Sequence, residues 1–323
     1  MSEIPTPPII VGTRGSELAL VQATATEAAL AQAFPKISIH RQVIKTTGDR
    51  RTDVALSEVA KAEGIFDKGV FIKELEQALD SGEIDIAVHS LKDMPTTLGE
   101  RFEVAAVLER APVRDVLVTR QPGGLDSLPQ GARIGTSSVR RAMQIKWLRP
   151  DLTVHDIRGN VPTRLRKLAD GDDYDAILLA EAGLIRLHLI PFTGPEEGEG
   201  SDPVNGFENL HATRLAEDKF LPAAGQGAIG LEIRSHDARS RALAHTIGHA
   251  ETWTRISAER EFLRLLDGGC HTPVGVSSCI KGKQLHLKAI VFPEQGGEPK
   301  TAEISGLAIH PIDLAFQLFQ SLS

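Results

Sequence analysis

The sequence predicts an α/β fold, in which two similar α/β domains flank a cleft and a smaller C-terminal α+β domain follows. Two stretches, "PPIIVGTRGSELALVQ" and "GARIGTSSVRRAMQIKWL", share one plan: a short apolar strand, a glycine turn, a serine and a helix. Two others, "ALDSGEIDIAVHS" and "KLADGDDYDAILLA", both lead from a helix end through a glycine turn and an aspartate into an apolar strand. This repeated unit predicts mostly parallel sheets covered by helices.

The first unit begins with a strand near residues 9–14 and a helix from about Glu17. Ser16 is the expected N-cap of that helix, because a serine hydroxyl accepts a hydrogen bond from a free N–H of the first turn. The charged, glycine-containing stretch "KTTGDRRTDVALSEVAKAEGIFDKG" follows, and then an amphipathic helix. That stretch is typical of a lid over a ligand, and equally of a plain surface loop.

The second unit repeats the plan, with Ser138 at the start of its helix. A stretch rich in Gly, Pro and acidic residues, "LIPFTGPEEGEGSDPVNGFENLHATR", predicts surface loops, and "KFLPAAGQGAIGLEIR" returns to a strand. From about Ser235, two helices precede strands at "VGVSSCI", "QLHLKAIVF" and "AEISGLAIH", which predicts a small antiparallel sheet. The expected domains are residues 1–110 with 212–232, residues 114–208, and residues 235–323.

The composition narrows the class of protein. The chain carries a net charge of −7 and two cysteines among 323 residues. No apolar run reaches the roughly 20 residues that cross a bilayer, and the N-terminus lacks the features of a secretory signal. We therefore expect a cytoplasmic protein, without a membrane or nucleic-acid partner and without a metal site. We also expect a monomer, because the sequence shows no obvious apolar patch.

One segment reverses the acidic balance of the chain. Between Arg133 and Lys167, nine basic residues stand against two aspartates, which gives a local charge of +7. A solvated basic face is the usual explanation of such a run. Seven of the nine are arginines, however, and the planar guanidinium group suits carboxylates and phosphates. An anionic ligand is therefore a second interpretation.

Polar residues follow an apolar strand in "DIAVHSLKDMPT". Turns at the carboxyl end of a strand in an α/β sheet are placed for ligand binding, and both "GT…S" turns are expected at such ends, where helix N-termini attract anions. Asp93 would be a carboxylate among arginines, suited to stabilising a cationic intermediate or to accepting a substrate N–H. The alternative is an ordinary Lys-Asp surface turn.

Cys270 lies in "LLDGGCHTPVG", between two glycines and a His-Thr-Pro turn. A core cysteine more often lies in an apolar run, as Cys279 does. The two cysteines are nine positions apart along an expected strand, which disfavours a disulfide. Cys270 is therefore either an incidental loop thiol or a reactive one.

Seven motifs taken together resemble those of the porphobilinogen deaminase (hydroxymethylbilane synthase) family. They are "GTRGSELAL", "GVFIKELEQAL", "DIAVHSLKDMP", "IGTSSVRRAMQ", "RGNVPTRLRKL", "LPAAGQGAIGLE" and "LDGGCHTPVG", and they run in order from about Ile9 to Gly275. The resemblance implies a three-domain fold whose first two domains resemble periplasmic binding proteins. It also implies a transferase of tetrapyrrole (haem and chlorophyll) biosynthesis. Such an enzyme joins four porphobilinogen molecules head to tail, with loss of ammonia, into hydroxymethylbilane.

The resemblance also assigns roles to individual residues. Cys270 is expected to hold a dipyrromethane cofactor through a thioether, and Asp93 to be the catalytic residue that stabilises cationic intermediates. The expected cofactor-binding residues are Lys92, Arg14, Ser16, Thr136, Ser138, Arg140, Arg141, Arg158 and Gln226. The expected substrate-binding residues are Arg14, Arg158, Arg164, Arg186, Phe71 and Lys61.

The chain departs from the family pattern before "KGVFIKELE", where it reads "AKAEGIFDKG". The extra residues fall in the proposed lid, so Lys61 and Lys68 are both candidates for the lid lysine of the family. Two other classes of function remain as alternatives. A non-catalytic small-anion binding protein would use the same two-domain cleft without needing Cys270 or Asp93. A nucleic-acid binder would use the +7 segment, but that segment offers only Trp147 for base stacking.

Overall fold

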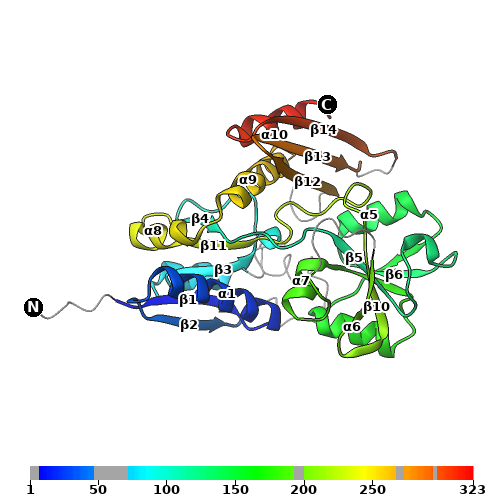
Figure 1. Cartoon of the computed structure of the whole chain (residues 1–323), viewed down its shortest axis with the longest axis horizontal. Coiled ribbons are helices and arrows are strands. Elements are labelled where there is room, and N and C mark those ends of the chain that lie inside the picture. Colours follow the sequence, from blue (N-terminus) through cyan, green and yellow to red (C-terminus); the bar gives the residue numbers. More distant parts are fainter. Residues whose placement is uncertain (1–6, 47–71, 193–199, 267–272, 294–296, 323) are drawn as a thin grey trace, which may run out of the picture. The chain divides into compact units, whose positions relative to one another are not determined.

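The computed structural model describes residues 7–46, 72–192, 200–266, 273–293 and 297–322 (Figure 1). The chain divides into two compact units, Met1–Arg110 with Ala228–Trp253 and Ala111–Gly227 with Thr254–Ser323. Each unit is built from two separate segments of the sequence, so residues far apart in the sequence share one core. Within the described ranges, no helix has both the length and the apolar character needed to cross a membrane.

The first unit contains a five-stranded sheet in the order β2-β1-β3-β11-β4. Its strands are β1 (Ile9–Arg14), β2 (Ile39–Ile44), β3 (Ile86–Ser90), β4 (Phe102–Val107) and β11 (Ile229–Arg234). Strand β1 is parallel to β2 and β3, whereas β11 is antiparallel to β3 and β4. The carboxyl ends of β1 and β3 therefore meet at one edge of the sheet.

Helices cover both faces of this sheet. They are α1 (Glu17–Ala33), α4 (Lys73–Asp80) and α8 (Ala238–Ile247), and a 3₁₀ turn, η2 (Leu91–Asp93), follows β3. Leu30 of α1 and Leu243 of α8 share a buried cluster with Val88 of β3, while Leu79 of α4 packs with Ala87. Since Val88 and Ala87 are consecutive in a strand, they point to opposite faces. The predicted cap is confirmed, because Ser16 Oγ accepts a hydrogen bond from Ala19 N at 3.3 Å.

The second unit contains a six-stranded sheet in the order β7-β6-β8-β5-β10-β9. Its strands are β5 (Asp115–Thr119), β6 (Arg133–Gly135), β7 (Thr153–His155), β8 (Ala176–Ala180), β9 (Ser201–Val204) and β10 (Phe207–Arg214). The helical elements beside them are η3 (Leu125–Ser127), α5 (Val139–Leu148), α6 (Val161–Asp170) and α7 (Glu181–Arg186). Leu165 of α6 and Leu184 of α7 share a buried cluster with β5 and β8, and Ile145 of α5 belongs to another cluster with the same strands.

The two sheets confirm the internal duplication predicted from the sequence. In each, a parallel trio of strands (β2-β1-β3 or β7-β6-β8) is followed by antiparallel neighbours. The first helix of each copy, α1 or α5, begins directly after a serine cap at Ser16 or Ser138. Both copies therefore present a glycine turn and a helix N-terminus after their central strand.

The C-terminal part of the second unit is a small α+β layer, as predicted. It contains β12 (Val274–Lys281), β13 (Gln284–Val291), β14 (Lys300–Leu307), α9 (Ala250–Leu265) and α10 (Pro311–Gln320). The three strands form consecutive antiparallel pairs. Phe262 of α9 and Leu318 of α10 are fully buried in a cluster with these strands.

One expectation about the sheets is wrong. They are mixed rather than mostly parallel, because β11 and β5 run antiparallel to the central strands of their sheets. A continuous apolar run in the sequence predicts a strand that is buried on both faces. It does not tell whether that strand runs parallel or antiparallel to its neighbours. The proposed boundaries, residues 1–110 with 212–232, 114–208 and 235–323, stay a prediction. Strand β11 lies in the sheet of the first unit, and β10 ends at Arg214 in the sheet of the second.

Candidate functional site

A pocket of about 90 Å³ opens at the carboxyl edge of the first sheet. Arg14 is the last residue of β1, Ser16 caps α1, and Asp93 ends the 3₁₀ turn directly after β3. All three line the pocket, together with Leu18, Ala19, Gln22, Ile72, Val88, His89 and Ser90. The parallel pairing of β1 and β3 thus brings one predicted cation, one hydroxyl and one predicted catalytic carboxylate together.

Asp93 is the exposed carboxylate of this pocket. Within the part of the chain that the structure describes, its side chain takes part in no hydrogen bond or ion pair. Lys92, its neighbour in the same turn, is half-buried. An oxygen pair without protein donors is available to the N–H groups or positive charge of a bound molecule.

Sequence reasoning missed Gln22 as a residue of this pocket. Its Nε2 donates to Ser90 Oγ at 2.8 Å, and that hydroxyl donates back to Gln22 Oε1 at 3.2 Å, so α1 and β3 are joined at the pocket wall. Gln22 lies on the same helical face as Leu18 and Ala19, four and three residues earlier. The signal was a glutamine in the buried stripe of a helix made mainly of Ala and Leu.

The second unit offers the equivalent turn after β6. Thr136 is buried, and its hydroxyl accepts a hydrogen bond from Ser138 N at 3.2 Å. Ser138 in turn caps α5 by accepting from Arg141 N at 3.4 Å. Both residues therefore shape the start of the helix that carries Arg140 and Arg141.

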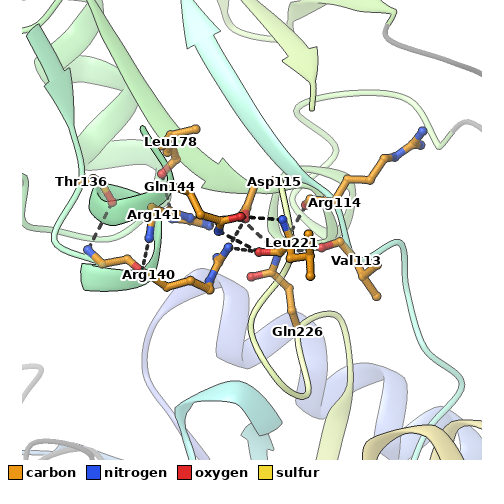
Figure 2. A network of polar contacts seen from close by, with 11 residues as sticks. Val113, Arg114, Asp115, Thr136, Arg140, Arg141, Gln144, Leu178, Leu221 and Gln226 are labelled. Carbon is orange, nitrogen blue, oxygen red and sulfur yellow. Dashed lines mark hydrogen bonds and ion pairs between the residues drawn. The ribbon is translucent and has the colours of Figure 1, made fainter. Parts of the chain in front are cut away.

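Arg140 and Arg141 converge on one buried carboxylate, Asp115, at the start of β5 (Figure 2). Arg140 Nη1 donates to Asp115 Oδ2 and to Leu221 O, each at 2.6 Å. Arg141 donates to Asp115 Oδ1 from Nη2 at 2.6 Å and from Nε at 3.0 Å. Both arginines are only 6% exposed. Their charges are therefore directed at Asp115 in this structure.

Burial dominates the electrostatics of this cluster. It lowers the pKa of Arg140, against the opposing effect of the Asp115 charge, and the neighbouring Arg141 charge lowers it further. Arg140 Nε is buried without a hydrogen-bond partner among the described residues. Sequence reasoning missed Asp115. The signal was an aspartate at the start of the apolar run "VLVT".

Gln226 joins the same network, as Figure 2 shows. Its buried Nε2 donates to Val113 O at 2.6 Å and to Asp115 Oδ1 at 3.2 Å. The next residue, Gly227, has φ +82°, and a Cβ there would lie 2.4 Å from Ala111 O. Only glycine fits that position, so the "GQG" turn places Gln226 against the start of β5.

Comparison with known proteins identifies the family. The family model "Porphobilinogen deaminase, dipyromethane cofactor binding domain" matches residues 9–242, and "Porphobilinogen deaminase, C-terminal domain" matches residues 253–323. The porphobilinogen deaminase of Syntrophobacter fumaroxidans is 42% identical over 92% of this chain and 88% of its own. That of Desulforudis audaxviator is 44% identical over 94% and 90%. The chain belongs to the porphobilinogen deaminase family.

The solved structures that match this chain are more distant. The regulatory domain of OxyR2 from Vibrio vulnificus is 14% identical, with a TM-score of 0.42 over 76% of this chain and 97% of that one. The periplasmic domain of BvgS from B. pertussis is 15% identical, with a TM-score of 0.40 over 75% and 40%. These similarities are too weak to inform function.

The other arginines predicted from the porphobilinogen deaminase resemblance all lie in the second unit. Arg158 precedes α6 and is half-buried, and Arg164, in its first turn, donates from Nε to Gly159 O at 2.8 Å. Arg186, the last residue of α7, donates from Nη2 to Gly227 O at 2.8 Å. Burial lowers the pKa of Arg186 to about 10, so it remains a cation at neutral pH.

The donor set of the described pocket suits the cofactor of the porphobilinogen deaminase family. Pyrroles with acidic side chains need cations for their carboxylates and an acceptor for their N–H groups. Arg14 supplies a cation and Ser16 a hydroxyl donor for the carboxylates, and Asp93 supplies the acceptor for the N–H groups. Cys270, Lys61 and Phe71 lie outside the described residues. Among the described residues, no group of three or more His, Cys, Asp or Glu side chains could hold a metal ion.

Proposed function

We propose that this member of the family joins four porphobilinogen molecules head to tail, with loss of ammonia, into hydroxymethylbilane. Family membership supports porphobilinogen deaminase activity in tetrapyrrole biosynthesis, and the chain carries the dipyrromethane cofactor binding domain of the family. The observation that carries the residue roles is the convergence of Arg14, Ser16 and Asp93 at one pocket.

Asp93 is the proposed catalytic residue. Its carboxylate is exposed at the pocket and has no partner among the described residues. It is therefore in place to accept pyrrole N–H groups and to stabilise positive charge that develops on the substrate carbon when ammonia leaves. A fixed charge at that point lowers the barrier without reorganisation of solvent.

The arginines are the proposed partners of the acidic side chains. Each porphobilinogen carries an acetate and a propionate group, so the product brings two carboxylates for every ring. Arg158, Arg164 and Arg186, with Arg14, are the proposed substrate-binding set. Within the second unit, three cations at α6, at α7 and in the loop before α6 suit a ligand with several carboxylates better than a single small ion.

The remaining predicted residues are proposed to hold the cofactor. Dipyrromethane, attached through the Cys270 thiol, supplies the pyrrole to which the first substrate unit is joined. Lys92, Arg14, Ser16 and Arg158 are proposed to contact its carboxylates. Thr136, Ser138 and Gln226 shape the turns around Arg140 and Arg141, and these five residues complete the proposed set. Phe71 and Lys61 are proposed to contact the substrate.

Three further proposals concern the whole protein. They are three domains with the boundaries given above, a monomer, and a cytoplasmic location. Two cysteines in 323 residues suit a reducing compartment.

Intact-mass measurement of the purified chain tests the proposed function. The expected result is a covalent adduct of two pyrrole units, which Cys270→Ser removes, together with ammonia release from porphobilinogen by the unaltered protein. Cys279→Ser is the matched control and should keep both the adduct and the activity. A chain without adduct and without ammonia release would instead support the small-anion binding protein.

A further inference from the structure

His89 and Glu232 form a buried pair at the pocket of the first unit. His89 is on β3 and Glu232 on β11, and the antiparallel register places His89 opposite Gly230 and Glu232 opposite Ala87. The two side chains are therefore diagonal neighbours on one face of the sheet. His89 Nε2 lies 2.8 Å from Glu232 Oε2, and the side chains are only 5% and 0% exposed.

This contact fixes the roles of the two ring nitrogens. A carboxylate only accepts hydrogen bonds, so Nε2 carries the hydrogen and Nδ1 is the atom left to accept one. Nδ1 has no hydrogen bond to any residue in the described part of the chain. His89 is also one of the residues that line the pocket of Asp93.

Charged groups of four elements surround or share the pocket of His89. Glu232 of β11 contacts its ring, and Glu76 of α4 interacts with it electrostatically. Arg14 of β1 and Asp93 of η2 line the same pocket. Burial raises the pKa of Glu76, and the negative charge of Glu232 raises it further, while His89 and Arg101 oppose the shift. The second oxygen of Glu232, Oε1, is buried without a hydrogen-bond partner among the described residues. A half-satisfied buried carboxylate contributes little to stability compared with an apolar pair. A role in orienting His89 accounts for its presence.

The chemistry of the proposed function requires a proton acceptor. Joining two pyrroles through a methylene breaks a C–N bond, whose electron pair leaves with ammonia. It also breaks a pyrrole C–H bond, whose electron pair stays in the ring, so one proton is released for each unit added. We propose that His89, oriented by Glu232, is a further catalytic residue that accepts this proton on Nδ1. The inference rests on the proposed function.

The test compares His89→Asn with Glu232→Gln and with His40→Asn, an exposed histidine of β2 as the matched control. General-base catalysis contributes about 10²–10⁴-fold, so kcat of His89→Asn should fall by at least about 100-fold. The pH profile of kcat in His89→Asn should differ from that of the unaltered enzyme, because the proton acceptor is gone. Glu232→Gln should also lower kcat, because it alters the contact that orients the imidazole ring. His40→Asn should behave like the unaltered protein.

Intact mass provides a readout besides activity. His89→Asn should keep the two-pyrrole adduct, which separates a lost proton acceptor from a lost cofactor. Wild-type kcat and an unchanged pH profile of kcat in His89→Asn would overturn the inference while leaving the proposed function standing. Absence of both adduct and activity in the unaltered protein would overturn the proposed function itself.

NMR of the unaltered protein keeps the inference testable if His89→Asn does not fold. With ¹⁵N-labelled histidine, the imidazole signal that Glu232→Gln perturbs most should show the Nε2–H tautomer. Its Nδ1 resonance should shift on addition of porphobilinogen, while that of His40 should not. An Nδ1–H tautomer, or an Nδ1 resonance unmoved by porphobilinogen, would overturn the inference.

Discussion

Arg141 binds Asp115 side-on, with Nε and Nη2 at 3.0 and 2.6 Å from the same oxygen, Oδ1. Arg140 takes the other oxygen, Oδ2, at 2.6 Å. One buried carboxylate thus neutralises one of two buried guanidinium groups. The remaining positive charge gives the second unit an internal electrostatic bias towards anions, even though neither guanidinium is exposed.

Asp115→Asn tests how far the fold depends on this carboxylate. Removing one partner from a buried ion pair leaves uncompensated charge, and here two guanidinium groups lose their counter-ion. The free energy of unfolding should fall by about 3–5 kcal/mol, as measured by urea denaturation.

Asp175→Asn is the matched control for that experiment. Asp175 also pairs with an arginine, Arg133, but at 3.1 Å and with side chains that are 35% and 41% exposed. An exposed pair contributes at most about 1 kcal/mol. Equal losses of stability in the two variants would show that burial of Asp115 has no special consequence.

Arg186→Gln separates ligand binding from stability. Burial lowers the pKa of Arg186. The buried charge therefore carries a desolvation free energy in the folded state that is absent in the unfolded chain. Removing that charge should leave the midpoint of urea unfolding unchanged or higher. The KM for porphobilinogen should rise by about 10-fold or more if Arg186 binds a carboxylate, since charged hydrogen bonds contribute about 1.5–3 kcal/mol.

Arg133→Gln is the control for Arg186, because Arg133 is a half-buried arginine of the same unit that is paired with Asp175. Its KM should match that of the unaltered chain. If the two variants had the same KM, Arg186 would have no part in substrate binding.

Local features of the fold and site were predictable from the sequence. The strand, glycine turn and serine cap preceding Glu17 recur before Val139, because an N-cap and a strand are encoded within a few residues. The proximity of Arg14 and Asp93 followed from the rule that parallel strands bring their carboxyl ends to one edge.

Long-range partners were not predictable in the same way. Asp115 lies 25 residues from Arg140 and 111 from Gln226, and nothing in the local pattern indicates that the three share one buried network. The same limit applies to β5 and β11, whose apolar residues predict a strand but not its direction. The sequence shows which charged residues are present. Which of them form ion pairs depends on which are buried together in the folded chain.

Asp237 gives stability that depends on pH. It caps α8 by accepting from Ser240 N at 2.9 Å and pairs with Arg234 Nη2 at 2.6 Å. Burial alone would raise the pKa of Asp237, but the hydrogen bonds from Ser240 and Arg234 together hold it below its ordinary value. A depressed folded-state pKa means that the stabilisation is complete above the unfolded pKa of about 3.9 and is lost as pH falls through the folded value.

Asp237→Asn isolates the charge, because asparagine caps a helix about as well as aspartate. The unaltered chain should have the higher Tm at pH 7, and the difference should shrink as the pH falls below about 4. Thermal unfolding between pH 7 and pH 3 measures it. A difference that stays constant across this range would mean that the ion pair with Arg234 is not its source.

Asp93→Ala provides the most direct test of the proposed site. The side chain is exposed and has no partner among the described residues, so the free energy of unfolding should change by no more than about 0.5 kcal/mol. Loss of a preorganised charge at the reacting centre costs about 10²–10³-fold in rate, so kcat for ammonia release should fall by at least that factor. Asp80→Ala is the control, since Asp80 is an exposed aspartate of the same unit, paired with Arg101. Turnover by Asp93→Ala at the rate of Asp80→Ala would remove Asp93 from the mechanism.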